Sequence, residues 1–436
     1  MVSVNDAPLK VALLGCGNVG AQVARLLLES PADLKARTGR ALDLIGIAVR
    51  HPDAEREGID PALFTGDAAG LVTQADLVVE VIGGIEPART LILAAIAHGA
   101  SVVTANKALL AAHGPELYAA AREAGVDLYF EAAVAGAIPI VRPLRESLVG
   151  DEILAVLGIV NGTTNYILDR MTTDDLTFGE ALTQAQELGF AEADPTADIE
   201  GYDAAAKASI LASLAFHTEI AGADVHREGI TAITTEDIAS AASLGYVVKL
   251  LAVATLVNGG GPERVSVRVH PALVPADHPL AAVRGPNNAI FVQSRNAGQL
   301  MFSGPGAGGA PTASAVMGDL VTVARNRARG TAGPPLTPYT HRAVAPIDDA
   351  RTSYYLTLTV KDSPGVLAKV ASVFAKHGVS ISAVRQTQIP GATGTANLGI
   401  MTHVARDAEV QETIAELRTA SQAVTGRIRH IRVEGN

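Results

Sequence analysis

The sequence of 436 residues contains a single cysteine, Cys16, and no tryptophan. One cysteine excludes an intramolecular disulfide and a zinc site built from several cysteines, and it favours a reducing compartment. Cations are also scarce, because 34 Lys and Arg stand against 45 Asp and Glu, which gives a formal net charge of -11. We therefore expect neither nucleic acid nor a membrane as a partner, since both attract clustered positive charge.

Hydrophobic runs of membrane-spanning length are missing as well. The best candidate, GYVVKLLAVATLV, is interrupted by Lys249 and is too short to span a bilayer, so we expect a buried helix there. The first twenty residues carry no basic segment ahead of their apolar run, unlike a secretory signal. These absences favour the cytoplasm, and the length suggests about three domains at roughly 150 residues each.

The first third of the chain alternates between aliphatic runs and helix-like stretches. The runs are almost continuously hydrophobic, as expected of strands that are covered on both faces, and they span residues 9–15, 42–49, 76–83, 101–106 and 126–132. Helical patterns separate them, for example at residues 21–30 and 88–99. This alternation predicts an α/β domain with a Rossmann-like, doubly wound parallel sheet.

The rest of the chain follows two other patterns. From 131 to 305, residues 150–171 and 264–274 indicate strand and loop, whereas 178–189, 202–217 and 237–255 indicate helix, so we expect an α+β domain. A glycine loop and a long helix follow at 304–330, and then a linker rich in Gly, Pro and Thr. The last 84 or so residues predict the order βαββαβ, which is the ferredoxin-like unit.

The first strand-like run ends in a glycine turn, GCGNVG, with Gly15, Gly17 and Gly20 ahead of a helix. The first glycine permits the tight turn, the second lets a pyrophosphate approach the backbone, and the third allows close packing of helix on strand. We expect a nicotinamide dinucleotide at this turn, contacted also by Asn18 and Val19. A purely structural glycine turn is the alternative.

The end of the second strand distinguishes the two nicotinamide cofactors. An NAD-selective enzyme usually places Asp or Glu there, but this strand runs into Arg50 and His51, and Asp43 lies at its other end. Arg50 therefore suggests the 2′-phosphate of NADP, with a solvated arginine as the alternative. Covalent aldehyde oxidation is disfavoured, because Cys16 lies within the glycine loop and no second cysteine exists. Direct hydride transfer remains, and it requires a proton donor.

The candidate donor is Lys207. It follows Asp203 by four residues in an alanine-rich helix, so both side chains share a face. A buried structural ion pair is the alternative. Acidic residues upstream, Glu192 and Asp198 among them, suit a substrate with an ammonium group, although a solvated acidic loop gives the same pattern.

Two further segments are candidates for the site. Lys107 follows a strand end, where ligands bind in open α/β sheets, although a surface lysine at a helix start is also consistent. Glu131 begins the apolar segment EAAVAGAIPIV, whose carbonyls together with this carboxylate could hold a monovalent cation, unless the segment is a plain buried strand.

In order, GCGNVG, VVTANKALL, YFEAAVAGAIPIVRPL, GIVNGTTNYIL, the segment from GFAEADP to SLAFH, REGI and GAGGAPTASAVMGDL resemble homoserine dehydrogenase, specifically the bacterial form with a C-terminal ACT domain. The resemblance covers essentially the whole chain. It implies NAD(P)-dependent interconversion of L-homoserine and L-aspartate 4-semialdehyde, in the biosynthesis of threonine, methionine and isoleucine.

The resemblance also implies roles for particular residues. Lys207 would donate the proton, Lys107 would reach substrate or nicotinamide and share that role, and Glu192 would bind the substrate's amino group. Asp198 and Asp203 would order the site, and Gly306 would close over the nicotinamide. The family's sodium site would map to Glu131 with backbone groups of Val134, Gly136 and Ile138.

The same resemblance implies the domain bounds. Residues 1–130 plus 306–330 would form the nucleotide-binding domain, 131–305 the catalytic and dimerisation domain, 331–352 a linker and 353–436 the ACT domain. The loop KDSPGVLAKV, with Asp362, Pro364 and Gly365, resembles ACT domains, which suggests feedback by L-threonine, or else a purely oligomerising module. We expect a homodimer or homotetramer. A different NADP-linked reductase, or a nucleotide sensor without catalysis, remains as an alternative.

Overall fold

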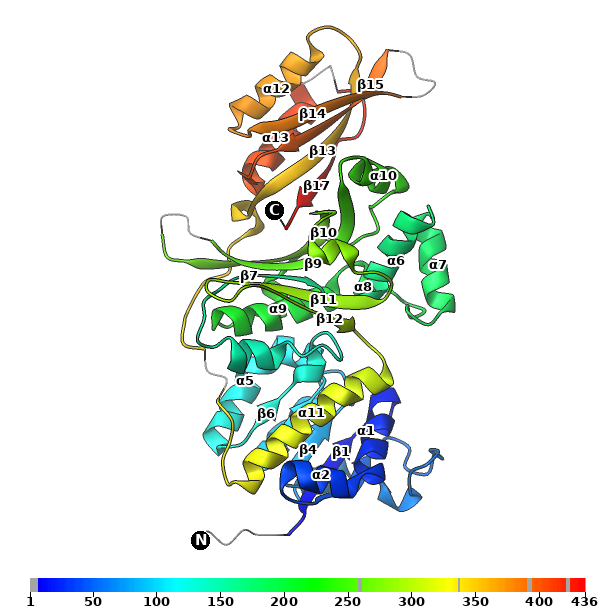
Figure 1. Cartoon of the computed structure of the whole chain (residues 1–436), viewed down its shortest axis with the longest axis vertical. Helices are drawn as coiled ribbons and strands as arrows, with labels where there is room; N and C mark the ends of the chain where they lie inside the picture. The colour runs from blue at the N-terminus through cyan, green and yellow to red at the C-terminus, as the bar shows by residue number, and fades with distance from the viewer. Residues whose placement is uncertain (1–6, 258–260, 336–337, 390–393, 421–423, 436) are drawn as a thin grey trace. The chain divides into compact units, whose positions relative to one another are not determined.

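The structure is a computed structural model that describes residues 7–257, 261–335, 338–389, 394–420 and 424–435 (Figure 1). Its contacts divide the chain into two compact units. The first comprises Met1–Gly162, Asp203–Val225 and Pro286–His341, and the second comprises Thr163–Tyr202, His226–Gly285 and Arg342–Asn436. Each unit therefore contains segments that are distant in the sequence.

The first unit is built on a six-stranded parallel sheet of order β3-β2-β1-β4-β5-β6. Its strands are β1 (Leu9–Leu14), β2 (Leu42–Ala48), β3 (Phe64–Thr65), β4 (Leu77–Glu80), β5 (Ser101–Thr104) and β6 (Leu128–Tyr129). The connecting helices are α1 (Asn18–Glu29), α2 (Pro31–Thr38), α3 (Ala68–Val72), α4 (Ala88–Ala97) and α5 (Lys107–Ala124). The predicted doubly wound α/β sheet is confirmed.

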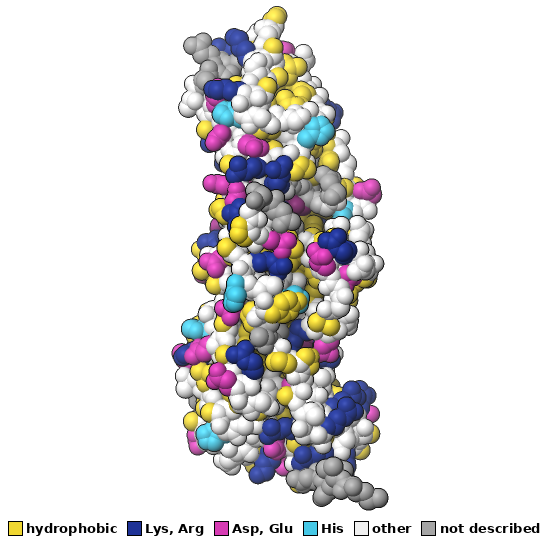
Figure 2. Space-filling model, turned by 90° about the vertical axis from the view of Figure 1, so that its left-hand side faces the viewer, with side chains coloured by type: hydrophobic (Ala, Val, Ile, Leu, Met, Phe, Trp, Pro, Cys, Tyr) yellow, Lys and Arg dark blue, Asp and Glu magenta, His cyan; other side chains and the backbone are white. Residues whose placement is uncertain are grey.

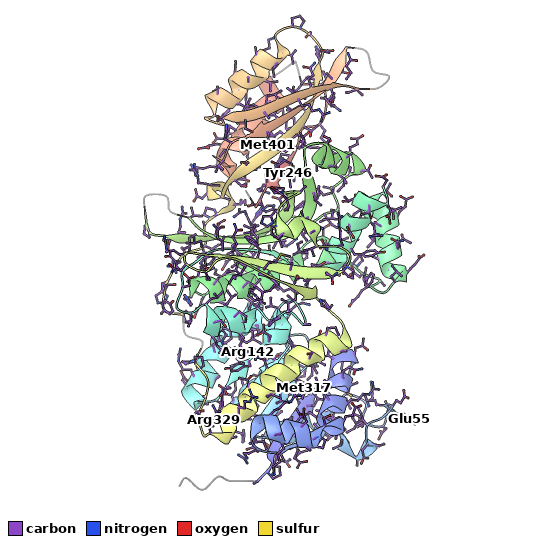
Figure 3. The ribbon with its side chains drawn as sticks, in the orientation of Figure 1. Glu55, Arg142, Tyr246, Met317, Arg329 and Met401 are labelled. Atoms are coloured by element: carbon purple, nitrogen blue, oxygen red, sulfur yellow. The ribbon has the colours of Figure 1, made fainter. Side chains whose placement is uncertain are left out.

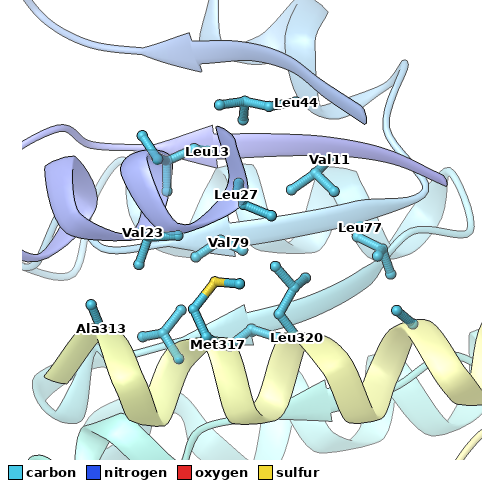
Figure 4. Close-up of a cluster of buried hydrophobic side chains, with 14 of the residues drawn as sticks. Val11, Leu13, Val23, Leu27, Leu44, Leu77, Val79, Ala313, Met317 and Leu320 are labelled. Carbon is cyan, nitrogen blue, oxygen red and sulfur yellow. The ribbon is translucent and has the colours of Figure 1, made fainter. Parts of the chain in front are cut away.

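Helix α11 (Gly309–Ala328) covers one face of this sheet, although it lies far along the chain (Figure 4). Val316 and Leu320 of α11 are fully buried in one apolar cluster with Val11 and Leu13 of β1 and Val23 of α1. Burial on both faces explains the almost unbroken hydrophobic sequence of the strands. It also explains the long apolar stripe of α11, whose Met317 is labelled in Figures 3 and 4.

The first unit also contains an antiparallel group of three strands, in which β11 (Asn287–Ser294) pairs with both β7 (Ile153–Ile159) and β12 (Gly298–Pro305). Helix α9 (Tyr202–Phe216) belongs to this unit from Asp203 onward. The sequence analysis indicated β7 and α9 but missed β11 and β12, which are joined by a short turn that leads into Gly298, with φ of 74°.

In the second unit, the run predicted to be a buried helix is a strand. Helix α10 (Thr235–Ser243) ends before Gly245, whose φ is 81°, and β9 (Tyr246–Val257) follows, with Tyr246 labelled in Figure 3. Strand β9 pairs along its whole length with β10 (Arg264–Pro275). The helical prediction for residues 246–255 was wrong, because a continuous apolar run fits a buried strand as well as a helix and this one is rich in β-branched valine.

A second correction concerns residues 162–171, the later part of the segment 150–171 that we expected to be strand and loop. They form helix α6 (Gly162–Thr173), and most of its side chains are buried. Two shorter helices follow, α7 (Phe178–Glu187), which begins with a complete capping box at Thr177 and Glu180, and α8 (Thr196–Ile199). The β-branched and polar residues of NGTTNY weaken the helical pattern, and burial of the helix overrides that local preference.

The C-terminal part of the second unit has the predicted βαββαβ order. It comprises β13 (Arg351–Lys361), α12 (Val366–Lys376), β14 (Ile381–Gln388), β15 (Thr395–Thr402), α13 (Asp407–Ala420) and β17 (Arg429–Val433), with a two-residue strand, β16 (Ala405–Arg406), before α13. The strand order is β14-β15-β13-β17, and β17 pairs in parallel with β10. The sheet of this domain therefore continues into β10 and β9.

Side chains of both charges are interspersed among the described residues on the face drawn in Figure 2. Within the described ranges, no helix is long and apolar enough to cross a membrane.

Candidate active site

The glycine turn connects β1 to α1. Gly15 has φ of 99°, and a side chain on Gly20 would place its Cβ 2.2 Å from the carbonyl oxygen of Gly15. Both positions therefore require glycine. A Cβ on Gly17 would meet nothing within 4 Å, so the space over the start of α1 is open. The free N–H groups and the positive end of this helix suit a pyrophosphate.

Val19 of this turn lines a cleft of about 280 Å³ at the carboxyl ends of β4 and β5. Ligands bind at this edge of open parallel sheets. The cleft is lined by both candidate lysines, by Gly136 and Gly306, and by Val19, Val81, Ile82, Gly83, Ala105, Asn106, Ala132, Ala133, Ala135, Ala307 and Thr312. The residues present therefore fit a dinucleotide cofactor.

Asp203 holds both lysines. The Nζ atom of Lys207 lies 2.7 Å from Asp203 Oδ2, and the Nζ atom of Lys107 lies 2.7 Å from Asp203 Oδ1. The Lys207 side chain is 11% exposed and that of Lys107 is 43% exposed. Burial disfavours the Asp203 carboxylate, but the two ammonium groups outweigh it and hold the pKa of Asp203 well below its ordinary value. The site thus combines two positive charges with one negative charge.

Two residues after β7 complete this arrangement. Lys207 donates from Nζ to the carbonyl oxygen of Val160 at 2.8 Å, and Asn161 donates from Nδ2 to Asp203 Oδ2 at 2.9 Å. Sequence reasoning cited Asn161 only as part of the NGTTNYI motif. Its position directly after a buried strand was the signal that could have placed it at the site.

Lys107 is positioned by the start of α5. Asn106 caps this helix, since its side chain accepts a hydrogen bond from Leu109 N, and it donates to Gly84 O at 2.6 Å. Glu80, fully buried at the end of β4, accepts from the backbone of Ile82 and Gly83 and so orders the neighbouring wall of the cleft. Neither residue was singled out from the sequence, although the bonds from Ile82 and Gly83 to Glu80 and from Leu109 to Asn106 are local.

The predicted cation segment has a more constrained structure than expected. The Glu131 carboxylate accepts hydrogen bonds from the backbone N–H groups of Ile140, Val141 and Arg142, at 2.5 to 2.9 Å. These three donors take most of the acceptor capacity of the carboxylate, so a monovalent cation at this segment would depend mainly on backbone groups. Among the described residues, no group of three or more His, Cys, Asp or Glu side chains forms a metal cluster.

The backbone of this segment turns sharply between Val134 and Ile138, which are both buried. Ala135 and Gly136 adopt φ of 57° and 60°, and a Cβ on Gly136 would lie 2.5 Å from Gly306 O. Gly306 therefore packs directly against the turn. Left-handed alanine is rare outside functional or tightly constrained turns, and here it lines the cleft.

Arg50 and Cys16 lie in the nucleotide-binding part of the first unit. Arg50 is exposed just beyond the carboxyl end of β2. Asp43 lies near the opposite end of β2, next to Lys10 in the strand register with β1. The Cys16 thiol is half-buried, and burial raises its pKa although Arg56 and Arg25 oppose this effect. A raised pKa disfavours the thiolate, which agrees with chemistry that needs no cysteine nucleophile.

The remaining predicted residues belong to the second unit. Glu192 is exposed in the loop after α7, and Asp198 is half-buried on α8. Their participation in the site around Lys207 stays a prediction.

Comparison with known proteins agrees with this geometry. Family models match three parts of the chain: "Homoserine dehydrogenase, NAD binding domain" at residues 15–131, "Homoserine dehydrogenase" at 139–321, and "ACT domain" at 354–422. The homoserine dehydrogenase of Mycobacterium tuberculosis is 52% identical over 437 residues, covering 99% of each chain.

Solved structures give the same result. The crystal structure of a homoserine dehydrogenase from Thiobacillus denitrificans matches with a TM-score of 0.91 and 39% identity, covering 98% of each chain. A hyperthermophilic archaeal homoserine dehydrogenase in complex with NADPH matches with a TM-score of 0.60 and 27% identity, covering 72% of this chain and 97% of that one. The chain therefore belongs to the homoserine dehydrogenase family, with an NAD(P)-binding domain and a C-terminal ACT domain.

Proposed function

We propose that the protein catalyses the reversible reduction of L-aspartate 4-semialdehyde to L-homoserine with NADPH. One observation carries the proposal: two lysine ammonium groups share the Asp203 carboxylate, and both lysines line a cleft that is also lined by Val19 of the GCGNVG turn. Reduction of a carbonyl to an alcohol needs a hydride donor on one side of the carbon and a proton donor near the oxygen.

The reduced nicotinamide supplies the hydride when the cofactor is bound. In the proposed reaction Lys207 donates a proton from Nζ to the aldehyde oxygen and stabilises the negative charge that develops there. Lys107, the more exposed of the two, binds the substrate beside the nicotinamide and is the alternative donor. Asp203 pairs with both ammonium groups and orients them.

The substrate is an amino acid, so its own charged groups need partners. We propose that Glu192 binds the substrate's ammonium group and that Asp198, together with Asp203, orders the site. The net positive charge of the two lysines and Asp203 also suits the carboxylate of the substrate.

We assign the remaining contacts to the cofactor and a cation. Gly15, Gly17, Asn18, Val19 and Gly20 would hold the pyrophosphate, and Gly306 would close over the nicotinamide. Arg50 supports NADP over NAD, because no acidic residue stands at the end of β2 to bind a ribose 2′-hydroxyl. A sodium ion would be held by Glu131 with backbone groups of Val134, Gly136 and Ile138.

Oxidation of NADPH with aspartate 4-semialdehyde, followed by absorbance of the reduced nicotinamide, tests the proposal. We expect turnover with this substrate and none with simple 2-oxo acids. Turnover with 2-oxo acids would instead indicate another reductase. Lys207→Ala should abolish turnover while cofactor affinity stays nearly unchanged. A variant that keeps most of its rate would remove Lys207 from the mechanism, and Lys107→Ala then tests the alternative donor.

The domain bounds given above, a homodimer or homotetramer and a cytoplasmic location belong to the same proposal. We also propose that the ACT domain binds L-threonine as an effector. The test compares full-length enzyme with a chain truncated before Ser353, and we expect threonine to inhibit only the first. A full-length enzyme that ignores threonine would refute this regulation.

A further inference from the structure

The REGI segment, residues 227–230, has no role in the chemistry proposed above, yet it lies in a dense set of contacts within the second unit. It follows the first residue of strand β8 (His226–Arg227), which pairs with β10. On one side it contacts residues 199–202, and on the other it contacts β17 of the C-terminal domain.

Residues 199–202 are held closely by this segment. The Arg227 guanidinium donates from Nη1 to the carbonyl oxygen of Glu200 at 2.9 Å and lies 3.3 Å from the ring centroid of Tyr202. Ile230 donates its backbone N–H to the carbonyl oxygen of Ile199 at 2.9 Å. A Cβ on Gly229 would lie 2.4 Å from the same oxygen, so this close approach requires glycine.

The turn formed by residues 199–202 directly precedes Asp203 in the sequence. It runs between Asp198, predicted to order the site, and Asp203, which pairs with both lysines. Tyr202 is bonded directly to Asp203 and is the first residue of α9. The conformation of this turn therefore sets where α9 begins.

Glu228 connects the REGI segment to strands β17 and β10. Its Oε1 atom accepts from Arg432 Nη1 at 2.7 Å, and its backbone N–H donates to Val269 O on β10 at 2.8 Å. Arg432 lies on β17, is 3% exposed and is also paired with Asp407 at 2.6 Å. Because Arg432 is buried and held by Asp407, its charge-assisted hydrogen bond gives Glu228 a defined position.

We infer that REGI is a positioning latch, in which the Glu228–Arg432 ion pair anchors the segment to the C-terminal domain while Arg227, Gly229 and Ile230 hold the turn before Asp203. The inference rests on the proposed function, because it assigns the latch to the same catalytic site. Neither Glu228 nor Arg227 is assigned contact with substrate or cofactor. They act through the backbone of residues 199–202.

Glu228→Ala in the full-length enzyme tests the latch. Arg432 keeps its pair with Asp407 in this variant, so the fold should persist. We expect kcat/KM for homoserine to fall roughly ten- to a hundred-fold, as for small misplacements of catalytic groups, while the dissociation constant for NADPH stays unchanged. Glu228→Gln, which keeps the shape and a weaker hydrogen bond, should lie between wild type and Glu228→Ala.

Arg429→Ala provides the matched control. Arg429 also lies on β17 and forms an ion pair, to Asp237 of α10 at 2.7 Å, but it contacts neither REGI nor residues 199–202 through that pair. We expect this variant to keep wild-type kcat/KM. Hydrogen exchange of the peptide containing residues 199–202 should accelerate in Glu228→Ala and not in Arg429→Ala.

The outcomes separate this inference from the proposed function. A wild-type enzyme without activity on homoserine would refute the proposed function. If the wild type is active, three results would overturn the latch. These are an unchanged kcat/KM in Glu228→Ala, equal losses of kcat/KM in Glu228→Ala and Arg429→Ala, and a loss of NADPH affinity in Glu228→Ala as large as its loss of kcat/KM. If Glu228→Ala does not fold, Arg227→Lys replaces it: this change keeps the charge but loses the planar group over Tyr202, and unchanged kcat/KM would again overturn the inference.

Discussion

Replacement of Asp203 by Asn is the sharpest test of how the two lysines are held. The substitution keeps the size and shape of the side chain but removes its charge, and with it both ion pairs at 2.7 Å. The Nζ atom of Lys207 would retain the Val160 carbonyl as a partner. We therefore expect a folded protein whose catalytic ammonium is poorly positioned.

The two ion pairs differ in strength. At an effective dielectric constant of about 20, unit charges about 4 Å apart attract each other by about 4 kcal/mol. The Lys107 side chain is 43% exposed, so water screens its pair to about 1 kcal/mol or less. The larger loss falls on Lys207, which is 11% exposed. Since about 1.4 kcal/mol corresponds to a tenfold change in rate, a loss of about 3 kcal/mol in positioning predicts a kcat about 100-fold lower.

The assay is steady-state oxidation of homoserine, together with NADPH binding measured by fluorescence and a thermal unfolding curve. Cofactor affinity should stay near the wild-type value, because the glycine turn does not depend on Asp203. Asp194→Asn serves as the control, since Asp194 is an exposed member of the same acidic run and bonds locally to Thr196. A folded Asp203→Asn variant with kcat within about threefold of wild type would refute the reasoning.

Three further predictions address other parts of the chain. Arg50→Ala should weaken NADPH much more than NADH in binding titrations, and equal losses would contradict contact with a 2′-phosphate. Burial lowers the pKa of Lys249 from its ordinary 10.5 to about 8, and Asp169 opposes this shift. Above pH 8 the unfolded chain therefore binds more protons at this side chain than the folded protein does. The free energy of unfolding should rise with pH in that range. Thermal unfolding from pH 8 to 10 should show that rise in wild type and lose it in Lys249→Met; parallel curves would contradict it. Leu320→Ala, fully buried on α11, should destabilise the first unit by about 2–5 kcal/mol in urea unfolding, and an unchanged transition would exclude its packing role.

The parallel sheet could be predicted because its signals are local. Runs such as residues 9–15 are buried on both faces, and the glycine turn follows the first of them directly. Strand β9 was mistaken for a helix because a continuous apolar run carries no period, and only its pairing with β10 decides between the two. Lys249 was read as an interruption, but its ammonium is satisfied by Asn165 Oδ1 and Val283 O.

In the candidate site, too, contacts between residues close in sequence could be predicted and contacts between distant segments could not. Asp203 and Lys207 are neighbours on one helix, so their pairing follows from spacing alone. The meeting of Asp203 with Lys107, and the contact from Asn161, join segments far apart in the sequence, and no local pattern encodes such contacts. The hydrogen bonds to the Glu131 carboxylate were unforeseeable for the same reason, because they depend on how the chain turns back at residues 140–142.

The placement of α11 has a consequence for synthesis of the protein. The glycine turn lies within the first twenty residues, but the helix that buries one face of its sheet ends at Ala328 of 436 residues. A nascent chain can therefore close the hydrophobic core of its first unit only after α11, which ends at Ala328, has been synthesised. Until then Val11, Leu13 and Val23 lack their final partners, and the ribosome-bound chain presents an apolar surface suited to chaperone binding.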